Sequence, residues 1–311
     1  MESDRLPVIA VVGPTATGKT RRAVSLARAF NGEIVSADSR QVYRCMDIGT
    51  GKDLDEYGDV PYHLIDICEP GEKYNLFRFL DDYAAVREDI ENRGRRVILC
   101  GGSGMYVENA LNNLTMPRVE PNRELRERLA GKSLDELSAI LGSMKKLHNI
   151  TDVDTVQRAL RAIEIQEYYR LHPSQTPVVS GNATPRRPSV VVALAIDRET
   201  RRDNISRRLK SRIDNGMIDE VRTLIKGGVD PDTLIYYGLE YKWITLFVTG
   251  RIGYDTMFRN LETAIHQFAK RQMTWFRGME KRGHTLHWLP YDIDNNEMIE
   301  KVTQWDTALR V

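Results

Sequence analysis

The chain has few cysteines, no long apolar run and almost no net charge. Its 311 residues include only three cysteines, Cys45, Cys68 and Cys100, which are far apart and form no Cys-x-x-Cys pair. This excludes a disulfide framework and indicates reduced thiols in a cytosolic protein. Apolar runs such as 190–196 are far shorter than the roughly 20 residues that span a bilayer, and the N-terminus lacks a signal-peptide pattern. We therefore expect a cytoplasmic protein with no membrane segment.

The charge balance excludes a uniformly basic surface for nucleic acid. The formal net charge is +1, although local clusters of either sign remain compatible with that total. Apolar residues make up 41% and charged residues 29% of the chain, the balance of a globular protein. Any contact with an anionic partner must therefore come from particular basic residues.

Short apolar runs alternate with amphipathic helical patterns in the first hundred residues or so. This pattern predicts strands at 8–12, 33–37, 63–67 and 96–100, with a long helix at 76–92. Because parallel strands need crossover connections, we expect an α/β fold with a doubly wound, mainly parallel sheet.

A helical insertion is predicted to interrupt this core. After residue 105 strand patterns stop, helical patterns follow at 121–147 and 153–171, and 173–188 has the composition of a mobile loop. A strand at 189–196, helices at 198–213, 217–225 and 254–277, and a short strand at 285–289 then return to the core. The predicted domains are a core of 1–113 and 189–311 and an insertion of 114–188.

A phosphate-binding loop lies between the first predicted strand and helix. Residues 13–20 match Gly-x4-Gly-Lys-Ser/Thr, in which backbone N–H groups and the helix dipole face an anion. Lys19 would neutralise phosphate oxygens, and the Thr20 hydroxyl would ligate Mg²⁺, the expected cofactor. The predicted diphosphate-binding residues are Gly13, Pro14, Thr15, Ala16, Thr17, Gly18, Lys19 and Thr20.

The loop alone leaves the reaction open. In a small-molecule or nucleotide kinase it would hold ATP while a P–O bond breaks. It would serve equally for a donor whose C–O bond breaks and whose pyrophosphate leaves.

Other segments closely resemble the tRNA dimethylallyltransferase (tRNA isopentenyltransferase) family, a family with a P-loop NTPase-like fold. They are ADSRQVYR at 37–44, MDIGT at 46–50, HLID at 63–66, GGSGMY at 101–106, QRAL at 157–160 and AKRQMTW at 269–275. The resemblance implies transfer of a dimethylallyl group from its diphosphate to the N6 amine of the adenosine 3′-adjacent to the anticodon in tRNA. The implied partners are dimethylallyl diphosphate and the tRNA anticodon stem-loop, and a monomer is expected.

Five residues are candidates for catalysis: Lys19, Thr20, Asp38, Ser103 and Arg208. Asp38 matches the family's catalytic aspartate and ends a predicted strand, where it would take the proton of the adenine amine. An N-cap or a second-sphere Mg²⁺ carboxylate are the alternatives. Ser103 stands where the family has threonine and would orient the amine, or would be a plain turn serine. Arg208 matches an arginine aimed at pyrophosphate, although it lies on a helix with other arginines.

The residues expected to bind tRNA follow from the same resemblance. They are Asp38, Ser39, Arg40, Gln41 and Ser103 around the base, Arg126, Arg158 and Arg161 in the insertion, and Lys270 and Arg271 near the C-terminus. For each of these basic residues, the alternative interpretation is an ordinary surface charge exposed to solvent. For Trp275 and Phe276 we expect core packing rather than base stacking, because their spacing is that of a buried helical face.

Some positions depart from the family pattern. Leu239 and Glu240 stand where tyrosine and a basic residue are common, Asn204 where arginine is frequent, and His266 where arginine is usual. Two other functions remain open: a kinase or prenyltransferase acting on free adenosine nucleotides, and a noncatalytic RNA-binding module.

Overall fold

The structure, a computed structural model, describes residues 6–147, 153–175 and 186–310. The chain divides into two compact units, one of Met1–Asn113 with Pro185–Val311 and the other of Leu114–Thr184. Within the described residues, no helix combines the length and apolar composition that a bilayer span requires.

A six-stranded sheet with only parallel pairings forms the centre of the first unit. In spatial order its strands are β3 (Tyr62–His63), β2 (Gly32–Ser36), β4 (Arg96–Gly101), β1 (Val8–Val12), β5 (Ser189–Ala195) and β6 (Leu286–Pro290). β1, β2 and β4 are buried along their whole length, and β1 is a continuous apolar run, as expected for a strand covered on both faces. The predicted α/β fold with a parallel sheet is confirmed.

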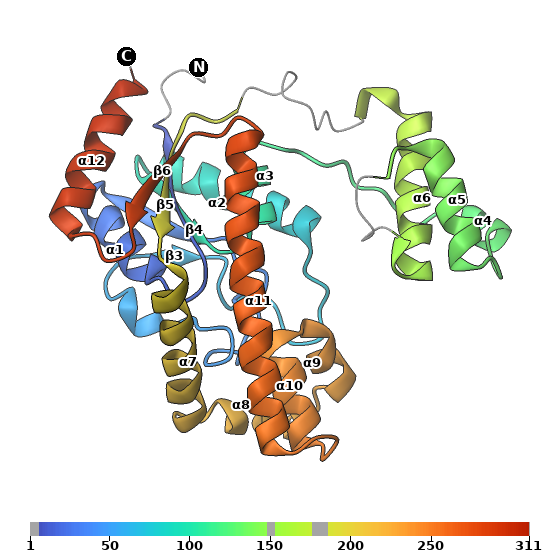
Figure 1. Cartoon of the computed structure of the whole chain (residues 1–311). Helices are drawn as coiled ribbons and strands as arrows, with labels where there is room; N and C mark the ends of the chain where they lie inside the picture. Colours follow the sequence, from blue (N-terminus) through green and yellow to red (C-terminus); the bar gives the residue numbers. More distant parts are fainter. Residues whose placement is uncertain (1–5, 148–152, 176–185, 311) are drawn as a thin grey trace. The chain divides into compact units, whose positions relative to one another are not determined.

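Helices cover both faces of the sheet (Figure 1). The chain moves in one direction along the sheet from β1 to β2 and in the opposite direction from β3 to β4, so right-handed crossovers place the two connecting helices on opposite faces. α1 (Lys19–Ala29) and α12 (Asn295–Ala308) contact each other on one face. α2 (Leu76–Asn92) and α3 (Gly104–Leu111) pair on the other, where α3 also contacts the long α11 (Tyr254–Lys281).

Four helices follow β5 and extend past the carboxyl ends of the strands (Figure 1). They are α7 (Arg198–Asp214), α8 (Met217–Lys226), α9 (Pro231–Tyr237) and α10 (Leu239–Val248). Gly216 (φ 96°) separates α7 from α8, and Gly238 (φ 79°) separates α9 from α10, both with the left-handed backbone that glycine favours. α10 contacts α8, α9 and α11, so these helices form a wall beside the end of the sheet.

The second unit is a small helical bundle. It contains α4 (Arg123–Arg128), α5 (Leu134–Met144), α6 (Val156–Leu171) and a 3₁₀ turn at Pro173–Gln175. Leu125, Leu137, Leu141 and Ile163 belong to its apolar core. The helical pattern predicted over 121–147 is two helices, because Gly131 (φ 79°) interrupts it before the capping box that begins α5.

Most predicted elements have bounds close to the observed ones, but three differences matter. The strand predicted at 63–67 ends at His63, because Leu64 (φ 62°) and Asp66 (φ 57°) have left-handed backbone. Helices α3, α9, α10 and α12 were not predicted. Residues 186–188 lie with the core rather than the insertion, since the Arg187 N–H donates to the Leu111 carbonyl (3.2 Å).

A buried ion pair joins the last helix to the middle of the sheet. The Arg96 side chain is 2% exposed and the Asp306 side chain 4% exposed, and both guanidinium Nη atoms contact the carboxylate, one at 3.1 Å. Met298, Val302 and Asp306 follow one another at helical spacing on the buried side of α12. Because one of these buried positions is a carboxylate, the sequence of α12 lacks a clear apolar helical pattern.

Replacing Asp306 by alanine should lower the free energy of unfolding by about 3 to 5 kcal/mol, because the Arg96 charge is left buried without its partner. Urea denaturation of purified protein measures this. The exposed pair Arg28–Asp59 provides a matched control, and Asp59→Ala should leave the urea midpoint unchanged. A loss below about 1 kcal/mol for Asp306→Ala would show that the pair does not anchor α12.

Candidate active site

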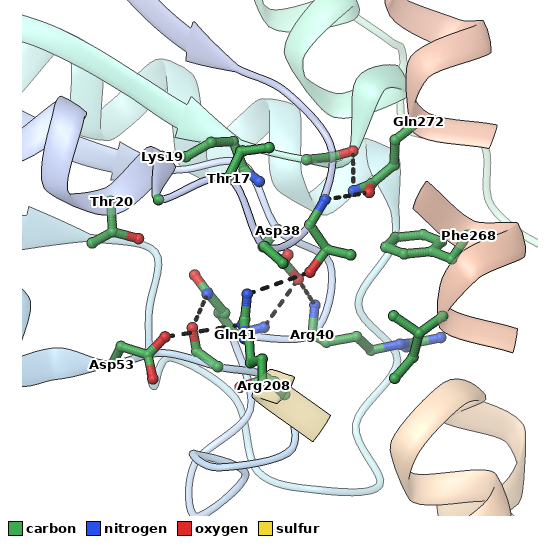
Figure 2. Close-up of a pocket in the computed structure, with 18 of the residues that line it drawn as sticks. Thr17, Lys19, Thr20, Asp38, Arg40, Gln41, Asp53, Arg208, Phe268 and Gln272 are labelled. Atoms are coloured by element: carbon green, nitrogen blue, oxygen red, sulfur yellow. Dashed lines mark hydrogen bonds and ion pairs between the residues drawn. The ribbon is translucent and has the colours of Figure 1, made fainter. Parts of the chain in front are cut away.

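The carboxyl ends of β1, β2 and β4 border a cavity of about 1090 Å³ in the first unit. Its lining comes from the loop after β1, the turns after β2 and β4, and helices α7, α10 and α11 (Figure 2). Pockets that hold one drug-sized ligand range from about 300 to about 1000 Å³, so this cavity lies at the upper end of that range. A smaller ligand would leave room in it for part of a second molecule.

The predicted phosphate loop lines the cavity from Thr15 to Thr20. The Lys19 ammonium donates a hydrogen bond to the Pro14 carbonyl (2.7 Å), and the Thr17 hydroxyl donates to the same carbonyl (2.8 Å). Burial lowers the pKa of Lys19 to about 8, so the ammonium is still charged at neutral pH. The loop thus holds one positive charge inside the cavity.

Three of the predicted diphosphate-binding residues have other backbone roles. Gly13 (φ 155°) packs against Leu194, and Pro14 has no N–H; neither lines the cavity. The Thr15 N–H donates to Gln272 Oε1 (2.9 Å) and is therefore engaged within the protein. The loop groups left for an anion are the N–H groups after Thr15, the Thr15 hydroxyl and the Lys19 ammonium.

Thr20, the predicted Mg²⁺ ligand, lies in the first turn of α1 with its side chain at the cavity (Figure 2). Its hydroxyl makes no hydrogen bond to any described residue. The described residues contain no cluster of three His, Cys, Asp or Glu side chains arranged for a metal. Mg²⁺ commonly uses one or two protein oxygens with substrate phosphates and water, so the Thr20 hydroxyl beside the phosphate loop fits this ion.

Asp38 lies two residues beyond β2 with its side chain at the cavity. Its Oδ1 accepts hydrogen bonds from the N–H groups of Arg40 (2.8 Å) and Gln41 (3.4 Å), which fixes the turn after the strand. Its Oδ2 accepts none from the described residues. The two oxygens therefore have different roles: one holds the turn, and the other is available to a ligand.

Ser39, Arg40, Gln41 and Ser103 also line the cavity. Ser103 Oγ accepts a hydrogen bond from the Ser39 N–H (3.4 Å), and the Arg40 guanidinium lies over the Tyr237 ring at 5.0 Å. The Gln41 amide accepts from Ser36 Oγ (2.9 Å) and donates to the Gly51 carbonyl (3.1 Å). Gln41 thus supports the cavity wall, with both ends of its amide engaged.

Arg208 reaches the cavity from α7 and faces the phosphate loop. Its Nη1 lies 3.4 Å from Thr15 Oγ1, and its Nη2 lies 3.9 Å from Asp53 Oδ2. Arg212, one turn further along, binds the same Asp53 oxygen at 3.0 Å. Burial and the neighbouring Arg212 lower the pKa of Arg208 to about 10, which leaves it charged at neutral pH. Arg208 and Lys19 therefore provide two positive charges within one cavity (Figure 2).

Three of the four departures from the family pattern lie at this cavity. Leu239 and Glu240 begin α10, and Leu239 has an unusual φ of 42°. Burial raises the pKa of the Glu240 carboxyl. Asn204 lines the cavity from α7 and donates to the Ala16 carbonyl at 3.5 Å. His266 does not line it, and burial lowers its pKa.

Lys270 and Arg271, which are also predicted to bind tRNA, do not line this cavity. Lys270 and Arg271 are exposed on α11, where the Arg271 guanidinium lies 5.9 Å from the Phe268 ring centre. Phe276 is fully buried as predicted, whereas Trp275 is 39% exposed and donates to Glu108 (2.8 Å).

The three arginines of the second unit that are predicted to bind tRNA are ion-paired within it. Arg126 binds Glu164 at 2.6 Å, and Arg161 binds the same carboxylate at 3.1 Å. Arg158 pairs with Asp154 one turn away.

Two residues important for this geometry were not predicted. The Glu220 carboxylate accepts N–H groups from Asp47 (2.8 Å), Ile48 (2.6 Å) and Gly49 (3.0 Å) and the Tyr241 hydroxyl (2.7 Å), which anchors a segment that lines the cavity. An acid in the first turn of a helix gives no sequence signal for that role. Gln272 gives one, because it is a polar residue on the apolar face of a long helix.

Comparison with known proteins finds similar sequences along almost the whole chain. The family model described as IPP transferase matches residues 41–279, and a second model, described as isopentenyl transferase, matches residues 6–57. The tRNA dimethylallyltransferase 2 of Bacteroides fragilis is 55% identical over 301 residues, covering 96% of this chain and 97% of that protein. The tRNA dimethylallyltransferase 1 of Parabacteroides distasonis is 55% identical over 296 residues, covering 94% and 95%.

A solved structure is similar over the same length. The full-length tRNA isopentenylpyrophosphate transferase of Bacillus halodurans superposes with a TM-score of 0.71 at 29% identity, covering 98% of this chain and 97% of that one. The resemblance seen in the sequence motifs is confirmed: the chain belongs to the IPP transferase family.

Proposed function

We propose that the chain transfers a dimethylallyl group from dimethylallyl diphosphate to the N6 amine of the adenosine 3′-adjacent to the anticodon in tRNA. The observation that carries this proposal is one cavity that contains both a phosphate loop and an unengaged carboxylate oxygen of Asp38. Its relatives are named tRNA dimethylallyltransferases. A kinase would use the same loop, but family membership favours C–O over P–O cleavage.

The donor side of the cavity suits a leaving diphosphate. As the allylic C–O bond breaks, negative charge grows on the diphosphate, where Lys19, Arg208 and the loop N–H groups would stabilise it. Thr20 would hold Mg²⁺, and the ion would supply further charge neutralisation when bound. These groups lie in one loop and on one facing helix, so they can act on a single diphosphate.

The acceptor side suits an adenine amine. The amine nitrogen forms a bond to the allylic carbon, and its proton must leave as that bond forms. Asp38 Oδ2 would accept this proton, while Ser103 and Ser39 would orient the amine. Base flipping would bring the adenosine out of the anticodon loop into the cavity.

The tRNA backbone would contact basic residues outside the cavity. Lys270 and Arg271 are exposed, and the described residues give them no carboxylate partner. In the second unit, an RNA phosphate must compete with Glu164 for Arg126 and Arg161 and with Asp154 for Arg158. We propose that the enzyme acts as a cytoplasmic monomer and that the second unit binds the tRNA.

The direct test is incubation with dimethylallyl diphosphate, Mg²⁺ and unmodified tRNA, followed by mass spectrometry of the nucleosides. Prenylated adenosine at the position next to the anticodon is the expected product. Transfer to AMP at the rate seen with tRNA would support the free-nucleotide alternative, and tRNA binding without transfer would support a noncatalytic module.

Asp38→Asn should lower kcat by roughly 10² to 10⁴ while the KM for dimethylallyl diphosphate changes by less than about threefold. The asparagine oxygen can still accept the Arg40 and Gln41 N–H groups, so the turn persists while the base is lost. Asp38→Ala removes the turn contact as well and should raise both KM values. Equal kcat for Asp38→Asn and wild type would rule out the base role.

Pyrophosphate affinity should fall above about pH 8, by up to roughly tenfold per pH unit. The sign follows from Lys19: its pKa is lowered to about 8, so the anion-binding ammonium is present below that pH and lost above it. Calorimetry with inorganic pyrophosphate between pH 6.5 and 9.5 measures this. The ratio of dissociation constants for wild type and Lys19→Arg cancels the titration of pyrophosphate itself. A flat ratio would contradict the assignment.

A further inference from the structure

A buried glutamine lies where α11 passes the ends of β1 and β4. Gln272 is 6% exposed, and its neighbours on the same face of the helix, Ile265, Ala269 and Phe276, are buried apolar residues. An amide in such surroundings is costly unless both of its ends are hydrogen-bonded. The partners of Gln272 therefore indicate why a polar residue occupies this position.

The Gln272 amide connects two backbone segments. Its Oε1 accepts the Thr15 N–H at 2.9 Å, and its Nε2 donates to the Gly102 carbonyl at 2.9 Å (Figure 2). One partner is a donor and the other an acceptor, so only one orientation of the amide satisfies both. The approach to Gly102 is close: a Cβ there would lie 2.3 Å from Nε2.

The two hydrogen bonds of Gln272 lie just beyond the last backbone pairing between β1 and β4. The pairing of β1 with β4 ends at Val12 and Gly101. Past that point the two strands separate: β1 leads into the phosphate loop, and β4 leads into the turn that carries Ser103. The Gln272 amide links the two segments directly after this separation.

The helix that carries Gln272 is itself fixed at two places. Trp275 Nε1 donates to Glu108 of α3 at 2.8 Å, and Ser206 of α7 donates to Glu262 at 2.6 Å. α11 is therefore held in place by its neighbours. Gln272 is the residue through which this helix binds the phosphate loop and the turn after β4.

We propose that Gln272 is a positioning residue that sets the distance between the diphosphate on the phosphate loop and the amine beside Asp38 and Ser103. The inference rests on the proposed prenyl transfer. Displacements of about 1 Å strongly affect the rate of a reaction between two held groups. A displaced loop would still stabilise the leaving diphosphate while the amine lies out of reach.

This role predicts a particular error when Gln272 is lost. The allylic C–O bond still breaks and pyrophosphate leaves, but the oxygen of a water molecule bonds to the allylic carbon and its proton goes to solvent. The products are dimethylallyl alcohol and pyrophosphate. A loss of folded protein would lower transfer and hydrolysis together, whereas a loss of positioning raises hydrolysis relative to transfer.

The first experiment compares Gln272→Met with wild type, because methionine keeps the length of the side chain and removes both hydrogen bonds. With tRNA, Mg²⁺ and labelled dimethylallyl diphosphate, the ratio of alcohol to prenylated tRNA should rise at least roughly tenfold, and kcat for transfer should fall roughly 10². Gln304→Met, an exposed glutamine on α12, is the matched control and should behave as wild type.

The second experiment uses the pH profile of Gln272→Glu. A carboxylate can still accept the Thr15 N–H but repels the Gly102 carbonyl, and protonation restores the donor. Transfer by this variant, divided by that of wild type, should rise as pH falls from 8 to 5.5. Gln272→Met should show a flat ratio over the same range.

The outcomes separate the two proposals. If wild type and Gln304→Met transfer the prenyl group but folded Gln272→Met keeps the wild-type ratio of alcohol to product, the positioning role is overturned and the proposed function stands. If wild type itself transfers nothing to tRNA, the proposed function fails and this inference fails with it.

Discussion

The phosphate loop, Asp38 and Ser103 depend on one constraint: the strands of a parallel sheet end at the same edge. β1, β2 and β4 are neighbours whose carboxyl ends lead into the phosphate loop, the Asp38 turn and the Ser103 turn. Backbone hydrogen bonding along the three strands therefore fixes where a diphosphate and an amine would meet. The helices after β5 close this edge and add Arg208, so a charge distant in sequence reaches the loop.

Local sequence patterns predict the part of the site that depends on local geometry. The spacing of the glycines and Lys19 between a strand and a helix predicts the phosphate loop. The role of Asp38 follows from the resemblance of its motif to the family. Long-range pairings were beyond prediction, because nothing near Glu220 in the chain indicates that it binds the backbone of residues 47–49. The Asp306 carboxylate interrupts the apolar pattern of α12, and its partner Arg96 lies 210 residues away in the sequence.

The short β3 illustrates the same limit. Its apolar residues continue beyond His63, so the pattern favours a longer strand. Left-handed backbone at Leu64 and Asp66 instead turns the chain towards the segment after β2, where the Ile67 N–H donates to the Val42 carbonyl (2.8 Å). Fully buried Lys52 binds the Asp66 carboxylate and the Tyr43 carbonyl in the same region. Lys52 thus adds a tertiary ion pair to this turn that the local sequence pattern does not indicate.

The hydrogen bond between Lys19 and the Pro14 carbonyl also bears on how the loop would receive a ligand. It uses one of the three hydrogens of the ammonium, so two would remain for the oxygens of an arriving diphosphate. Because the Pro14 carbonyl already orients the Lys19 side chain, less entropy would be lost in ordering that side chain when the diphosphate binds.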